Sequence, residues 1–258
     1  MTDRVSLVIE KGIATLTLDR PEQGNTIDLP MARALLEAAL RCDEDDAIRC
    51  VAITGRGKLF CGGGDIESFA QAGDSIGSFL SELAAALHMA LSRLLRMRKP
   101  LVTLINGAAA GAGMSLAIAG DIAIAARSAN FTAAYGALGL SPDGGMSWRL
   151  PRLVGLRLAQ DIILMNRRVT SEEAAAIGLV SRVVDDEALA EAGAKVAAEL
   201  AAAPTAALGA ARNLLLDSFE TPLEAQLERE ARSIASLGCS AETRASVAAF
   251  LARRNTRN

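Results

Sequence analysis

The sequence has few of the residues from which metal and redox sites are built. It contains one histidine, His88, and its four cysteines show no CxxC or paired spacing. A site made of histidine and cysteine ligands is therefore not expected, and we predict no bound metal. Unpaired cysteines at scattered positions fit reduced thiols in a cytoplasm, which is the location that we predict.

Other absences narrow the class of protein further. No apolar run reaches the length of a membrane span, and the first residues lack the apolar core of a signal peptide, so we expect no membrane association. The net charge of −3 gives no general attraction for nucleic acid, and an anionic ligand would need a local basic patch. Aromatic residues make up 3% of the chain, so aliphatic side chains must form the core.

The sequence does carry the pattern of a layered α/β protein, in which short apolar runs typical of strands alternate with helical patterns up to about residue 190. Beyond that point only alanine- and leucine-rich helices are predicted. We therefore expect a core of residues 1–190 and a helical region of residues 191–258 that packs on the core or on another subunit. The predicted strands are residues 5–9, 13–18, 48–54, 101–105, 121–126 and 179–184.

Two glycine clusters, residues 62–64 and 111–113, each follow a predicted strand. Neither cluster has the Gly-Lys-Ser/Thr of a phosphate-binding P-loop, and neither fits the spaced glycines of a dinucleotide-binding turn well. Close packing of two backbones explains such clusters as readily as a binding role does. The functional alternative is that each cluster supplies one backbone N–H group, and that both groups point at one developing oxyanion.

An oxyanion site needs an acid or a base beside it, and Asp143 is the leading candidate, although aspartate is also common in ordinary turns. His88 flanks the apolar stripe of its helix and is a second candidate, with a merely packed or surface histidine as the alternative. Asp65 follows the first glycine cluster, where an aspartate commonly caps the next helix. Cys61 has no activating neighbour in the sequence, and Ser115 lies outside the nucleophile-elbow pattern.

A series of motifs, in order and at characteristic spacing, resembles the enoyl-CoA hydratase/isomerase family, also called the crotonase superfamily. The resemblance runs from about residue 5 to residue 184 and is weaker in the tail. The motifs are LDRP at residues 18–21, Asn25, Thr54-Gly55, FCGGGD at 60–65, Lys99-Pro100, NGAAAGAG at 106–113, GLSP at 139–142, RLPRLVG at 149–155, Glu173-Ala174 and GLV at 178–180.

This resemblance implies a ββα spiral core with a helical trimerisation tail, assembled as a homotrimer or as a hexamer of two trimers. It implies an acyl-CoA thioester substrate, with coenzyme A as part of the substrate and no covalently bound cofactor. It places the two oxyanion donors at the N–H groups of Gly64 and Ala112. It also implies coenzyme A contacts from two loops and from the basic tail, involving Gln23, Gly24, Asn25, Gly62, Asp65, Ile66, Arg253 and Arg254.

The departures from the family pattern bear on the reaction. A typical hydratase of the family uses two glutamates, and their positions hold Ser115 and Tyr135, which we place in the substrate pocket. The remaining carboxylate, Asp143, resembles the base of family members that shift double bonds. We therefore predict a Δ3,Δ2-enoyl-CoA isomerase-like enzyme.

Three alternatives to the isomerase remain. One is an enoyl-CoA hydratase. Another is an aryl- or acyl-CoA dehalogenase or hydrolase, in which Asp143 is the nucleophile and His88 the base. The third is a binding protein without catalysis.

Overall fold

The computed structural model describes the backbone of residues 4–255 and the side chains of residues 4–252. The predicted coenzyme A contacts from Arg253 and Arg254 therefore concern side chains that lie outside the described residues. Among the described residues, no helix is both long enough and apolar enough to cross a membrane.

A six-stranded sheet, in the order β1-β2-β3-β4-β6-β9, forms the centre of the fold. The first two strands, β1 (Val5–Glu10) and β2 (Ile13–Leu18), are the antiparallel hairpin that the sequence predicts. The others are parallel to β2 and to one another, and they are built from apolar runs, as expected of strands covered on both faces. They are β3 (Cys50–Gly55), β4 (Leu101–Ile105), β6 (Ile122–Ala126) and β9 (Arg182–Val184).

A small second sheet, in the order β5-β7-β8, was not expected from the sequence. Its strands are β5 (Ala109–Ala110), β7 (Asn130–Thr132) and β8 (Arg168–Thr170). Segments of two or three residues are too short to show the alternation that identifies a strand, and none of the predicted strands covers them. The small sheet carries the second glycine cluster toward the site described below.

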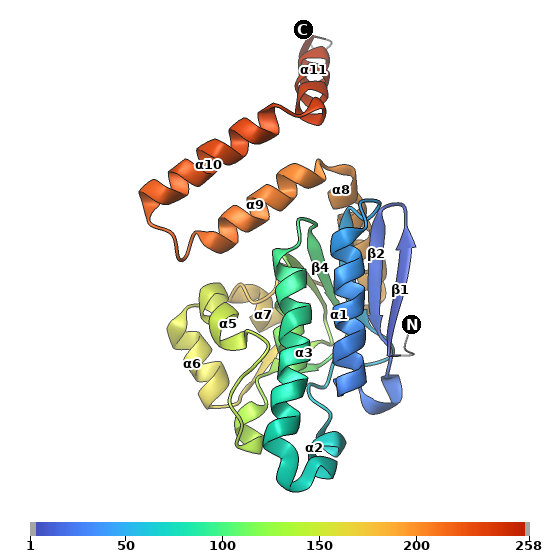
Figure 1. Cartoon of the computed structure of the whole chain (residues 1–258). Helices are drawn as coiled ribbons and strands as arrows, with labels where there is room; N and C mark the ends of the chain where they lie inside the picture. The colour runs from blue at the N-terminus through green and yellow to red at the C-terminus, as the bar shows by residue number, and fades with distance from the viewer. Residues whose placement is uncertain (1–3, 256–258) are drawn as a thin grey trace.

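Helices α1 (Leu29–Glu44) and α3 (Ile76–Arg96) pack against each other in front of the main sheet (Figure 1). Asp28 caps the first of them, since its carboxylate accepts a 2.8 Å hydrogen bond from the Met31 N–H. The short helices α2 (Ile66–Ala72) and α4 (Ala112–Ala117) follow the two glycine clusters. The remaining helices before the tail are α5 (Met146–Val154), α6 (Leu156–Leu164) and α7 (Ser171–Ala176).

Helix α8 (Leu189–Ala202) packs against β2, β3, β4 and β6 and passes behind the strands in Figure 1. Gly193 of this helix lies against the side chain of Leu104 in β4. The domain boundary at residue 190 stays a prediction, and α8, on the far side of that boundary, is packed on the core. What leaves the core in Figure 1 is the segment after α8.

The last three helices, α9 (Thr205–Asp217), α10 (Leu223–Gly238) and α11 (Ala241–Asn255), extend away from the sheet (Figure 1). Arg212 joins α9 to the core, because its buried guanidinium donates to the carbonyl groups of Met97 and Lys99 and pairs with Asp121 at 2.5 Å. Large apolar side chains of the tail are more than half exposed, among them Leu215, Phe219, Leu223, Leu227, Ile234 and Phe250. An apolar surface of this kind is what the predicted trimerisation would cover.

Candidate active site

A cavity of about 340 Å³, here called the front cavity, opens between α2, α3 and the two glycine clusters. Its floor and walls are mostly apolar. Of the described residues that line it, Asp143 alone carries a carboxylate. Its lining includes Gly62, Gly63, Gly64, Ile66, Phe69, Leu80, Leu83, Leu87, Gly111, Ala112, Tyr135, Leu138 and Leu140.

The two glycine clusters meet at this cavity through direct backbone contacts between residues 61–64 and 108–113, here called the glycine seam. The Cys61 N–H donates to the Ala108 carbonyl at 3.2 Å, and the Ala110 N–H donates to the Cys61 carbonyl at 3.0 Å. A Cβ atom at Gly113 would lie 2.2 Å from the Cys61 carbonyl oxygen, so a side chain at this position would force the two segments apart. Both readings of the clusters, close packing and convergence on one site, thus apply together.

The seam leaves two N–H groups available to the front cavity. Ile27 pairs with the residues on either side of Gly64, donating to the Gly63 carbonyl at 2.7 Å and accepting from the Asp65 N–H at 3.1 Å. In a parallel pairing of this kind, the N–H of Gly64 itself points away from Ile27. Ala112 is the first residue of α4, where an N–H group has no acceptor within the helix.

Asp143 is held on one side by Tyr135. The Tyr135 hydroxyl donates a 2.7 Å hydrogen bond to Oδ1 of Asp143, and the Ser115 hydroxyl donates a 2.9 Å hydrogen bond to the Asp143 carbonyl. Burial, and then the negative charge of Asp143, raise the pKa of Tyr135, so its hydroxyl keeps its proton and remains a donor. The Asp143 side chain is 33% exposed, which leaves Oδ2 open to a bound molecule.

His88 approaches Asp143 from the opposite direction. Its Nε2 accepts a 3.0 Å hydrogen bond from the Gly144 N–H and lies 3.8 Å from Oδ2 of Asp143. In accepting this bond, Nε2 presents its lone pair to the Gly144 N–H. The ring, which is 49% exposed, lines a second cavity of about 400 Å³, here called the back cavity.

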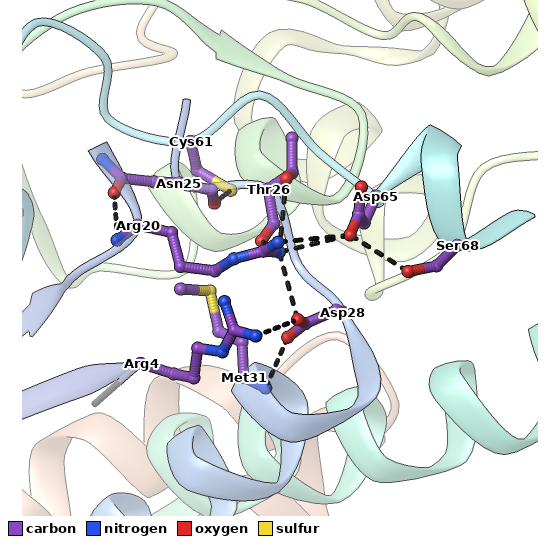
Figure 2. A network of polar contacts seen from close by, with 9 residues as sticks. All are labelled: Arg4, Arg20, Asn25, Thr26, Asp28, Met31, Cys61, Asp65 and Ser68. Carbon is purple, nitrogen blue, oxygen red and sulfur yellow. Dashed lines mark hydrogen bonds and ion pairs between the residues drawn. The ribbon is translucent and has the colours of Figure 1, made fainter. Parts of the chain in front are cut away.

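A buried arginine, Arg20, holds the loop of residues 20–28 (Figure 2). The Arg20 guanidinium pairs with Asp28 and Asp65, at 3.3 Å each, and donates to the Thr26 carbonyl at 2.7 Å. Asp65 also accepts a 3.0 Å hydrogen bond from Ser68. One side chain therefore ties the loop before α1 and the start of α1 to the start of α2, which directly follows Gly64.

The predicted coenzyme A contacts fall around this network. Gly62 and Ile66 line the front cavity, and the Gly62 N–H donates to the Gly24 carbonyl at 2.9 Å, which places the 23–25 loop beside the cavity. Gln23 and Gly24 do not themselves line it. The carboxylate of Asp65 is already bound by Arg20 and Ser68, so its predicted contact would have to come from its backbone.

Two structural findings go beyond the sequence analysis. Arg20 was noted only as part of the LDRP motif, whereas its burial beside two carboxylates shows that it organises the loop. Tyr135 was placed in the substrate pocket, but its hydroxyl is also the partner of Asp143. It is the single tyrosine of the chain, and no local sequence pattern indicates which carboxylate it contacts.

Cys61 is a structural thiol in this site, as its sequence context suggested. Its Sγ donates to the Asn25 carbonyl at 3.0 Å, and burial raises its pKa to about 12. Because the thiolate is the reactive form, this thiol is a poor nucleophile.

Comparison with known proteins gives one consistent result. Residues 8–257 match the family model described as enoyl-CoA hydratase/isomerase. The chain is 38% identical over 255 residues to the 1,2-epoxyphenylacetyl-CoA isomerase of Escherichia coli, a match that covers 96% of this chain and 95% of that protein. It is 33% identical over 236 residues to a 4-chlorobenzoyl coenzyme A dehalogenase of Arthrobacter, covering 91% and 86% of the two chains.

Among solved structures, an enoyl-CoA hydratase from Polaromonas sp. JS666 superposes with a TM-score of 0.92 at 30% sequence identity. The match covers 96% of this chain and 97% of that one. The α/β core of crotonase type that was expected from the sequence is thereby confirmed.

Proposed function

The chain belongs to the enoyl-CoA hydratase/isomerase family, and we propose that it shifts the double bond of a 3-enoyl-CoA thioester to the 2-position. Asp143 is the base in this reaction. The observation that carries the proposal is that Asp143 alone among the described lining residues brings a carboxylate to the front cavity, which Gly64 and Ala112 also line. One movable proton and one polarised thioester are all that this reaction requires.

The proposed reaction has two proton transfers. Oδ2 of Asp143 takes a proton from C2, which lies between the thioester and the double bond, and the electron pair moves into a dienolate. The Gly64 and Ala112 N–H groups stabilise the negative charge on the thioester oxygen. Asp143 then returns the proton to C4, and the double bond is left between C2 and C3. Because Tyr135 occupies Oδ1, Oδ2 is the oxygen that carries the proton.

The hydratase alternative is less well supported by the side chains present. Adding water across a double bond requires groups that activate the water and protonate the α-carbon. Ser115 and Tyr135 occupy the positions where the family resemblance puts the hydratase glutamates. Their hydroxyls are engaged with Asp143 itself, and neither can act as a carboxylate base.

A second candidate is a nucleophilic role for Asp143 on an aryl-CoA, the kind of compound that the name of the dehalogenase relative gives. The observation in its favour is the His88 ring, whose Nε2 lies 3.8 Å from Oδ2 of Asp143. In that reaction Oδ2 would attack the ring carbon and expel halide, and water activated by His88 would hydrolyse the resulting ester. Trapping a covalent aryl ester on Asp143 would favour this candidate.

For coenzyme A we propose a path over Gly62 and Ile66 at the mouth of the front cavity. Ile66 is 48% exposed there and offers an apolar surface to the ligand. The loop that holds Gln23 and Gly24 lies beside this path through the Gly62–Gly24 hydrogen bond.

The test compares the wild type with Asp143→Asn on 3-enoyl-CoA, 2-enoyl-CoA and a para-halobenzoyl-CoA. Asparagine keeps the size of the side chain but cannot take the proton, so we expect the double-bond shift to fall by about 10²–10⁴-fold. Asp46→Asn, in the exposed loop before β3, is the matched control and should behave as wild type. An inert 3-enoyl-CoA, or a fully active Asp143→Asn variant, would refute the proposal.

A further inference from the structure

We infer that the back cavity is the route by which the proton on Asp143 exchanges with solvent, and that His88 relays it; this inference rests on the proposed double-bond shift. The front cavity and the back cavity share no lining residue among those described. They meet at Asp143 and Gly144, since Asp143 lines the first and Gly144 the second.

The wall between the two cavities is thin because its residues are small. Ser115 and Gly144 both line the back cavity, and a Cβ atom at Gly144 would lie 2.8 Å from the Cβ of Ser115. No side chain larger than these could occupy the wall without moving it. His88 stands at this wall, with its ring in the back cavity and Nε2 facing Oδ2 of Asp143 across 3.8 Å.

A bound thioester closes the route from Asp143 to solvent through the front cavity. It fills the front cavity, and Oδ1 of Asp143 is occupied by the Tyr135 hydroxyl. The proton that Oδ2 takes from C2 then has two destinations, which are C4 of the substrate and Nε2 of His88. An approach of about 1 Å brings Nε2 and Oδ2 within hydrogen-bond distance.

The relay conserves protons at each step. The Oδ2–H bond breaks as an Nε2–H bond forms, and Nε2 gives up its hydrogen bond from the Gly144 N–H. The imidazolium then releases its Nδ1 proton to water in the back cavity. Reversal of these steps delivers a solvent proton to Asp143 while the dienolate is still bound. His88 thus acts through Asp143 and sets how often the transferred hydrogen is exchanged before it reaches C4.

The experiment is a single turnover of 3-enoyl-CoA in D₂O, with the fraction of product that carries deuterium at C4 measured by mass spectrometry. His88→Gln keeps an acceptor for the Gly144 N–H but cannot relay a proton, so deuterium per turnover should fall by about tenfold. Ser92→Trp, at the exposed rim of the back cavity, should lower it by covering the water. Met89→Gln, exposed on the same helix but not lining that cavity, is the control and should match wild type.

The outcomes separate this inference from the proposed function. Unchanged deuterium per turnover in His88→Gln overturns the relay, whether or not the turnover rate falls. A purely structural role of His88 would slow proton return to C4 and proton exchange with solvent equally, and the deuterium per turnover would then stay the same. Exchange of the C2 proton of the unreacted thioester is measured in the same samples. A wild type that shifts no double bond but shows His88-dependent exchange at C2 refutes the isomerase and keeps the relay, whereas neither shift nor exchange refutes both.

Discussion

The hydroxyl of Tyr135 donates to Oδ1 of Asp143 at 2.7 Å, and this bond leaves Oδ2 as the carboxylate oxygen that Tyr135 does not engage. Tyr135 comes from the turn after the small sheet, and Asp143 comes from the loop before α5. Tyr135 occupies one of the two positions where the family resemblance puts a hydratase glutamate, and Ser115 occupies the other. In the proposed double-bond shift, the Tyr135 hydroxyl orients Asp143 and is not itself the base.

Tyr135→Phe should separate orientation from binding. The phenyl ring still fills the pocket, but the carboxylate of Asp143 loses the donor that fixes its rotation. We expect kcat for the double-bond shift to fall by about ten- to a hundredfold, because small losses of alignment are costly to proton transfer. KM should change little. Equal kcat in Tyr135→Phe and wild type would show that the hydroxyl plays no part in orienting the base.

Ala112→Pro is a direct probe of the second oxyanion donor. Proline is well tolerated at the first position of a helix, so the substitution removes an N–H group with little cost to α4. The rate should fall by about 10²–10³-fold, as expected for loss of one donor. Ala112→Ser, which keeps the N–H, is the matched control. Similar rates in the two variants, measured at saturating thioester, would argue against an oxyanion role for Ala112.

Arg20→Leu tests the network in Figure 2. Asp65 would remain buried without its cation, and Asp28 would keep only Arg4, at 3.2 Å. Breaking a buried pair in this way typically lowers the free energy of unfolding by about 3–5 kcal/mol. Urea denaturation gives the value. Arg33→Leu removes an exposed pair with Glu82 and should cost at most about 1 kcal/mol. Comparable losses in the two variants would contradict the role assigned to Arg20.

The free energy of unfolding at alkaline pH should depend on the ionisation of the buried thiols. Burial raises the pKa of Cys61 and Cys50 to about 12 and of Cys42 to about 11, above the ordinary value of 9.0. Below pH 9 all three thiols are protonated in the folded and unfolded states. Above it the unfolded chain loses these protons first, so the free energy of unfolding should decrease as pH rises from 9 toward 12.

Chemical denaturation at a series of pH values measures this dependence. Cys61→Ala should make the free energy of unfolding fall less steeply with pH, because one of the three thiols whose ionisation differs between the folded and unfolded states is then absent. The exposed Cys239 offers the control, since Cys239→Ala should leave the slope as it is. A slope that is insensitive to the buried thiols would place the alkaline loss of stability elsewhere.

The apolar tail predicts self-association. Ile234, an exposed residue of α10, should lie in a subunit interface if the family trimer forms. Ile234→Glu should therefore shift the protein toward monomers in analytical ultracentrifugation, because it would bury a charge. Glu228→Gln, in the same helix but outside the groove that Ile234 lines, is the control. A wild type that sediments as a monomer at micromolar concentration would contradict self-association through the tail.

The main sheet could be predicted from the sequence because its strands are continuous apolar runs bounded by turns. Residues 101–105, for example, form β4 as expected, and the hairpin of β1 and β2 was also anticipated. The small sheet escaped prediction because β5 has two residues and gains its identity only by pairing with β7. Such strands are defined by their partners and carry no local pattern of their own.

The site was predictable only in part, and for a related reason. The convergence of the two glycine clusters follows from their positions after parallel strands. The pairing of Asp143 with Tyr135, and of His88 with Gly144, depends on loops whose paths are set by tertiary packing. Nothing in residues 135–143 or in α3 reveals these distances. Asp143 and His88 are candidates on the sequence alone, whereas the hydroxyl that meets Oδ1 and the nitrogen that lies near Oδ2 are set by the tertiary structure.

The glycine seam has a consequence for how a chain of this kind can change over generations. Its two N–H groups belong to the main chain, which point mutations leave in place at almost every position. The side chains at positions 88, 135 and 143 come from segments outside the seam, and Ser115 follows Ala112 by three residues in α4. Under the proposed function, a lineage can therefore exchange its acids and bases one codon at a time while both N–H donors are inherited intact.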